Sequence, residues 1–221
     1  MGLLSNQILM EKIEAGVITI ENFDKKYLAP ASYDLRLGEE AYKSAPPEKI
    51  NVRERGVLVI EPGQFIIFTT LENIKLTTKV AGHIGVRSFY TRKGLVPLLG
   101  PQLDPGYRGK PSINVFNVGT RDVVIPYGDP VCTVEFYELP IEATKTYSGP
   151  YQEKYGILVE DIQFLTETKG ATLRDVIQTI SSLSLSVKSL TESIKWIKWF
   201  VIALVPIMLS IFGATVAILL R

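Results

Sequence analysis

Short apolar or alternating runs recur through the first two thirds of the chain and predict β-strands. They cover residues 57–60, 64–70, 80–86, 112–118, 122–125 and 131–139. Turn-forming residues separate them at 61–63 (EPG), 104–109 (DPGYRG) and 127–129 (YGD). Strands at this spacing, with no helical pattern between them, are typical of a barrel, sandwich or jelly roll. A short helix is expected near the start, with Ser5 as its N-cap and Gly16 just past its end. Residues 1–156 are therefore expected to form one mostly β domain, followed by a linker over 157–170.

A second pattern, with apolar residues spaced alternately three and four apart, covers residues 171–198. The apolar positions are Leu173, Val176, Ile180, Leu183, Val187, Leu190, Ile194 and Ile197. This heptad pattern predicts a helical stalk in a coiled coil, and β-branched residues at both core positions favour three or more strands. The alternative is a single amphipathic helix packed on its own domain, because the flanking positions carry Ser and Thr instead of paired charges.

The last apolar run, from Trp199 to Leu220, contains 22 residues without a charge. At about 1.5 Å per residue, such a helix can cross a hydrocarbon core of roughly 30 Å. Trp196 lies at its entry and Lys195 and Lys198 flank it, as at a membrane interface. We expect a single-pass, tail-anchored membrane protein that contacts lipid and keeps its N-terminal domain in the cytoplasm. A buried core helix is the alternative.

Composition and charge exclude several classes. With 46% hydrophobic residues and a formal net charge of +1, the chain is too apolar and too nearly neutral to be disordered. One Cys and one His do not make a zinc cluster. Residues from 171 onward carry five basic and two acidic side chains, so the first 170 carry about −2 of the net charge. A slightly acidic domain lacks the footprint of a nucleic-acid binder, and we expect no nucleic-acid partner.

Five ordered motifs in the first 156 residues resemble those of the dCTP deaminase/dUTPase family. They are LAPASYDLRLG (28–38), EPGQFIIFTTLENIKL (61–76), VRSFYTRKGL (86–95), LDPGYRGKPSINVFNVG (103–119) and YGDPVCTVEFYEL (127–139). The resemblance implies a distorted β-barrel or jelly roll of the dUTPase type that assembles as a homotrimer, with active sites at subunit interfaces. It also implies a pyrimidine deoxynucleoside triphosphate, dUTP or dCTP, as substrate and Mg²⁺ as cofactor.

The family contains two chemistries, and two positions of this chain bear on the choice between them. The deaminases carry a proton-shuttling Glu at the position of Asn114, and an amide cannot take up and return a proton. The dUTPases use a carboxylate on the hairpin to activate water, and Asp104 stands there. The main hypothesis is therefore a dUTP diphosphatase that forms dUMP and diphosphate at the membrane surface. The alternatives are a dCTP deaminase or bifunctional enzyme, and a catalytically weak nucleotide sensor that signals through the stalk.

The resemblance also assigns the other site residues. Tyr107 would pack under the sugar, Arg87 and Ser88 would hold the phosphates, and Asp34 would contact Mg²⁺ through water. The remaining candidates for substrate contacts are Arg92, Asn114, Tyr147 and Lys154.

Several of these residues also have simpler structural interpretations. Asp104 could start a β-turn, Arg87 could form a structural ion pair, and Asp34 could be a hydrogen-bond acceptor in a strand. Tyr107 could merely pack in its hairpin, and Cys132 could be a core residue.

Overall fold

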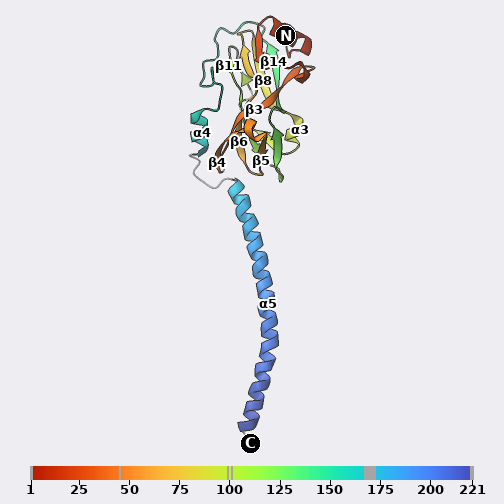
Figure 1. The fold of residues 1–221 in the computed structure, drawn as a ribbon, viewed down its shortest axis with the longest axis vertical. Coiled ribbons are helices and arrows are strands. Elements are labelled where there is room, and N and C mark those ends of the chain that lie inside the picture. Colours follow the sequence, from red (N-terminus) through yellow and green to blue (C-terminus); the bar gives the residue numbers. More distant parts are fainter. Residues whose placement is uncertain (1, 45, 99, 101, 167–172, 220–221) are drawn as a thin grey trace. The chain divides into compact units, whose positions relative to one another are not determined.

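The computed structural model describes residues 2–44, 46–98, 100, 102–166 and 173–219 of the chain. The chain divides into two compact units, Met1–Arg174 and Asp175–Arg221 (Figure 1). The strands of the first unit are β1 (Ile18–Glu21), β2 (Leu28–Ala29), β3 (Ser32–Ser44), β4 (Pro47–Asn51), β5 (Val57–Ile60), β6 (Phe65–Thr70), β7 (Asn73–Leu76), β8 (Val80–Val86), β9 (Leu95–Pro97), β10 (Gln102–Leu103), β11 (Arg108–Gly109), β12 (Ser112–Asn117), β13 (Val123–Pro126) and β14 (Pro130–Glu138). The helices are α1 (Asn6–Glu14), the 3₁₀ turn η1 (Lys25–Tyr27), α2 (Val52–Arg55), α3 (Ser88–Thr91), α4 (Val159–Thr166) and the long α5 (Leu173–Leu219).

The described strands of the first unit form a curled, mostly antiparallel architecture. The largest sheet has the order β10-β8-β14-β3-β6-β12-β9, with β2 and β4 also paired to β3. A three-stranded sheet, β1-β7-β11, and a two-stranded sheet, β13-β5, complete it. This arrangement confirms the expected mostly β fold.

The long strand β3 joins the two halves of the large sheet. Its first part pairs with β14, and its later part pairs with β6 and β4. The register with β6 shifts between Leu37 and Ala41, and Gly38 lies within this irregularity. A Cβ atom added at Gly38 would lie 2.4 Å from the carbonyl oxygen of Thr70. The absence of a side chain at Gly38 therefore allows β3 to change partners and the sheet to curl.

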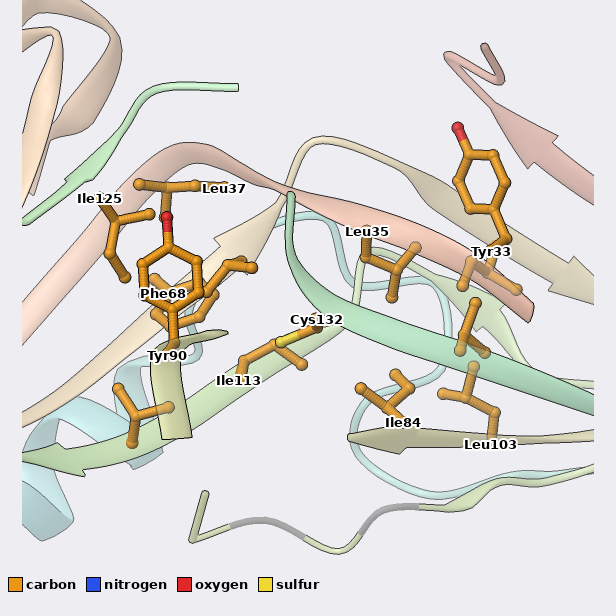
Figure 2. Close-up of a cluster of buried hydrophobic side chains, with 14 of the residues drawn as sticks. Tyr33, Leu35, Leu37, Phe68, Ile84, Tyr90, Leu103, Ile113, Ile125 and Cys132 are labelled. Carbon is orange, nitrogen blue, oxygen red and sulfur yellow. The ribbon is translucent and has the colours of Figure 1, made fainter. Parts of the chain in front are cut away.

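One hydrophobic core lies between these sheets. Its largest fully buried side chains include Tyr33, Phe68 and Phe136. Figure 2 shows Cys132 in this cluster beside Leu35 and Ile113. Cys132 is fully buried, and burial raises the pKa of its thiol, so the interpretation of Cys132 as a core residue is confirmed.

The predicted elements coincide closely with the observed ones. The run 57–60 is β5, and the other five runs are β6, β8, β12, β13 and β14 within one residue at each end. The Ser5 Oγ accepts from the N–H of Ile8 at the start of α1, and Gly16 has a φ of +70° just beyond the helix. The pattern did not predict β3, which is the central strand of the large sheet.

The C-terminal part differs from the expected division in two ways. The segment expected as a linker over 157–170 contains helix α4, which packs against β3. The expected stalk and membrane span form one helix, α5, with Pro206 inside it. Within the described part of α5, residues 176–212 are long and apolar enough to cross a membrane. Residues 171–172 of the stalk and residue 220 of the span lie outside the described residues, as does the side chain of Leu173.

The hydroxyl groups of α5 bond to the helix's own backbone. Six Ser and Thr side chains donate to carbonyl oxygens three or four residues earlier, at 2.8 to 3.0 Å, and these are Ser181, Ser182, Ser186, Ser189, Thr191 and Ser193. Such bonds satisfy polar groups that would otherwise need water.

Candidate active site

A tight turn between β10 and β11 holds Asp104. The N–H of Tyr107 donates to the carbonyl of Asp104 at 3.0 Å, and Gly106 has a φ of +83°. Pro at the second position and a left-handed Gly at the third are the requirements of a type II turn. The Asp104 Oδ1 accepts from the Nε2 of Gln102 at 2.8 Å, which orients the carboxylate. Asp104 therefore does start a β-turn.

The same carboxylate lines a cavity of ≈ 230 Å³, which we call the Asp104 cavity. Its apolar wall consists of Ile84, Leu103 and Ile113, which Figure 2 shows in the core cluster. Its other lining residues are Leu98, Gly100, Gln102, Asp104, Tyr107, Lys110, Pro111, Ser112, Asn114, Tyr147, Tyr151 and Asp161. The cavity thus brings together four predicted site residues: Asp104, Tyr107, Asn114 and Tyr147.

Strand β12 supplies the polar groups Ser112 and Asn114. Along this strand buried and half-buried residues alternate, so Ile113 points into the core while Ser112 and Asn114 share the opposite face. The Ser112 Oγ is buried and has no hydrogen-bond partner in the protein. The Asn114 amide can both donate and accept, but it does not titrate. This face of β12 can therefore bind the polar edge of a heterocyclic ring without supplying a carboxyl group.

Two tyrosines form another part of the wall. Tyr107 is only 6% exposed, and burial raises its pKa well above the usual range, with Tyr147 as a smaller cause. The two ring centroids lie 5.8 Å apart at an angle of 57°. Tyr107 therefore remains protonated at neutral pH and offers a ring surface rather than a charge.

The segment after β14 packs onto β11 and onto the turn that joins β10 to β11. The N–H of Tyr147 donates to the carbonyl of Pro105 at 2.9 Å, and the N–H of Glu153 donates to the carbonyl of Arg108 at 2.7 Å. In the other direction, the N–H of Lys110 donates to the carbonyl of Lys154 at 2.8 Å. These bonds place the segment beside the cavity.

Helix α4 then adds a second carboxylate, Asp161, whose Oδ1 accepts from the hydroxyl of Tyr151 at 3.0 Å. Sequence reasoning missed Asp161 because it expected a linker there, and no motif marks the residue.

Other predicted site residues lie outside the lining of this cavity. The Nε of Arg87 is 3.3 Å from the Oδ2 of Asp34, and the Oδ1 of Asp34 accepts from the hydroxyl of Thr133 at 2.7 Å. The structural interpretations of Arg87 and Asp34 are thus confirmed. Ser88 and Arg92 are exposed at the two ends of α3.

Lys154 is also exposed, and its backbone carbonyl accepts the hydrogen bond from the N–H of Lys110. Within one chain, the expected phosphate-binding residues and the Asp104 cavity are therefore separate.

The described residues do not form a metal site of their own. Among them, no group of three His, Cys, Asp or Glu side chains could hold an ion. Both oxygens of Asp34 already have partners, so Asp34 does not fit as a direct ligand. Mg²⁺ commonly keeps several waters and binds substrate phosphates, so it does not require such a cage.

Comparisons with known proteins give a consistent result. The sequence profile of a family described as dCTP deaminase-like matches residues 3–139. The dCTP deaminase of Thermococcus gammatolerans is 37% identical over 141 residues, which cover 64% of this chain and 87% of that protein. The protein of Aquifex aeolicus named dCTP deaminase, dUMP-forming, is 29% identical over 178 residues, covering 76% of this chain and 99% of that protein.

A solved structure shows the same fold. The 2′-deoxycytidine 5′-triphosphate deaminase from Agrobacterium tumefaciens superposes with a TM-score of 0.54 at 18% identity, over 62% of this chain and 48% of that chain.

Proposed function

From the premise that this chain belongs to the dCTP deaminase-like family, we propose that it is an enzyme that processes pyrimidine deoxynucleoside triphosphates and deaminates dCTP. The names of its relatives support this reaction more than the dUTP hydrolysis that the sequence favoured. The observation that carries the proposal is the Asp104 cavity, where Asp104, Tyr107, Asn114 and Tyr147 line one space beside the turn between β10 and β11.

The chemistry of the walls suits a nucleoside. The apolar residues Ile84 and Leu103 can cover the face of a base, and Ser112 and Asn114 can bond its polar edge. At ≈ 230 Å³ the cavity is smaller than the roughly 300–1,000 Å³ of whole-ligand sites. A triphosphate would therefore extend outside it.

Assembly of the chain as a homotrimer would supply the rest of the site. In this proposal Arg87 and Ser88 of an adjacent copy face the phosphates. Mg²⁺ arrives with the triphosphate and contacts Asp34 only through water.

A second candidate reaction is hydrolysis of dUTP to dUMP and diphosphate. Two observations favour it: Asn114 lines the cavity without a titrating group, and the oriented carboxylate of Asp104 can activate a water molecule. Formation of dUMP from dCTP, the reaction named for the Aquifex relative, requires loss of both ammonia and diphosphate. One cavity lined by both Asn114 and Asp104 can therefore serve the loss of ammonia or the loss of diphosphate.

We also propose that α5 tethers the enzyme to a membrane through its C-terminal part and self-associates through its heptad positions. This rests on the length and apolar composition of residues 176–212. The tether would hold the enzyme at the cytoplasmic face of the membrane.

The test is turnover by the full chain in detergent with Mg²⁺. Ammonia released from dCTP would support deamination, whereas diphosphate released from dUTP without ammonia from dCTP would establish the second reaction instead. Asp104→Asn should abolish diphosphate release, while Asp122→Asn, which removes the same charge from an exposed turn, should leave it unchanged. Nucleotide binding without either product would contradict both reactions and favour a sensing role.

A further inference from the structure

The Asp104 cavity contains a carboxylate that none of the sequence motifs includes. Asp161 lies in the first turn of α4 and lines the cavity together with Asn114 of β12. The two residues are 47 positions apart and belong to different elements. The cavity therefore has a second carboxylate besides Asp104, even though its β12 wall carries a neutral amide.

The surroundings of Asp161 hold its side chain in place. The hydroxyl of Tyr151 donates a hydrogen bond to its Oδ1 at 3.0 Å. Burial, and then the bond to Asp161, raise the pKa of Tyr151 to about 12, so the tyrosine donates its proton throughout the neutral range. A carboxylate in the first turn of a helix is also favoured by the helix dipole.

Helix α4 is itself fixed to the β domain. It packs against β3, and just before it the N–H of Ile157 donates to the Oε2 of Glu40 at 2.9 Å. The segment that leads to α4 is bonded to β11 and to Lys110 through Glu153 and Lys154. Asp161 thus lies at the cavity on a helix whose two sides are tied to the β domain.

We propose that Asp161 is the proton carrier for deamination, replacing the carboxyl group that Asn114 lacks. This inference rests on the proposed function. A water molecule adds to C4 of the cytosine ring; the new C4–O bond forms as one water proton passes to Asp161 and then to ring N3. Asp161 next takes the proton of the C4 hydroxyl and gives it to the amino nitrogen, the C4–N bond breaks, and ammonia leaves. Two protons are taken and two returned, so the carboxylate is regenerated and the ring becomes uracil.

Asn114 has a different part in this scheme. Its amide would bond the ring edge and hold C4 near Asp161, with Ser112 as a second partner for the base. Asn114 and Ser112 are then positioning and specificity residues.

The experiment measures ammonia release from dCTP by the full chain. Asp161→Asn keeps the acceptor for Tyr151 but cannot carry a proton, and it should lower kcat at least about 100-fold with little change in KM. Glu160→Gln removes the same charge from the neighbouring, exposed position of α4 and should retain full activity. Adding Asn114→Glu to Asp161→Asn should restore at least a tenth of the wild-type kcat, because a carboxyl group returns to the cavity.

A pH profile separates proton transfer from a structural effect. Any acid-side fall of the wild-type rate should be absent in Asp161→Asn and return in the double variant. Ammonia release by Asp161→Asn within twofold of wild type would overturn the role of Asp161 and leave the proposed function intact. Absence of ammonia release by wild type would overturn both.

Discussion

The ion pair between Arg36 and Glu72 gives the sharpest test of how the β domain is held together. Glu72 is fully buried, and Arg36 is 12% exposed. The Oε1 of Glu72 accepts from Nε of Arg36 at 2.6 Å, and its Oε2 accepts from the backbone N–H of Arg36 at 2.9 Å. Burial raises the pKa of Glu72 in spite of the guanidinium beside it. For Glu72 desolvation outweighs the pairing, whereas for Arg36 the bonds to Glu72 outweigh desolvation and raise the pKa of the guanidinium.

Glu72→Gln should destabilise the domain by about 3 kcal/mol, because the cost of a buried guanidinium without its partner exceeds the desolvation that the neutral amide relieves. The amide keeps the shape of the side chain but loses one charge-assisted bond, worth about 1.5–3 kcal/mol, and leaves Arg36 without a counter-ion. For a unit of this size, that loss should lower the Tm by about 6–12 °C. Urea and thermal unfolding of the full chain in detergent, followed by two spectroscopic probes, would measure it.

The double variant Arg36→Met/Glu72→Leu tests the reasoning behind this number. Replacing both ions by apolar side chains removes the desolvation cost together with the attraction, so it should be less destabilising than Glu72→Gln alone. Glu39→Gln, in an exposed pair with Arg53, should change stability little. A double variant less stable than Glu72→Gln would refute the argument.

Three further predictions concern the strand crossing, the cavity and the long helix. Gly38→Ala should lower the free energy of unfolding in urea by more than about 2 kcal/mol, because the new Cβ would meet the Thr70 carbonyl. Gly85→Ala in β8 has open space around the new Cβ, so it should change the free energy of unfolding by no more than about 0.5 kcal/mol. Ser112→Ala should leave the Tm unchanged or raise it, since the buried hydroxyl has no partner in the protein. The same substitution should raise the KM for the nucleotide, and an unchanged KM would show that the hydroxyl does not contact the substrate. Ile207→Arg should reduce retention of the full chain in carbonate-washed membranes, because a cation near the middle of a span costs about 2.5–3.5 kcal/mol, while Ser189→Arg should not.

The sequence predicted local elements well where one face of a strand is buried throughout. In β5, alternate residues are buried, and the strand has the predicted bounds. In β3, by contrast, the alternation of Tyr33, Leu35 and Leu37 stops at Gly38, where the strand changes partners. Because the pairing of β3 depends on strands far away in the sequence, no local pattern could give its length.

The candidate site was predictable to the extent that its residues lie in one turn and in a strand that follows it closely in sequence. Asp104, Tyr107 and Asn114 are close in sequence and meet in the cavity. Arg87 and Asp34 were predicted for the same site, but in one chain they bond each other instead. Asp161 was not predictable, because its place depends on how the segment after β14 packs, and a single Asp carries no motif.

The hydroxyl groups of α5 that donate to its own backbone limit the polar contacts that this helix can make with another helix. A hydroxyl group that already donates to its own helix has no proton left to donate to a second helix, so it does not fix the register between the two. Contacts between copies would then rely on Leu, Ile and Val side chains of similar size, which repeat every seven residues. A shift of one heptad would preserve most of those contacts. If α5 self-associates as proposed, neighbouring copies could therefore shift by one heptad at small energetic cost.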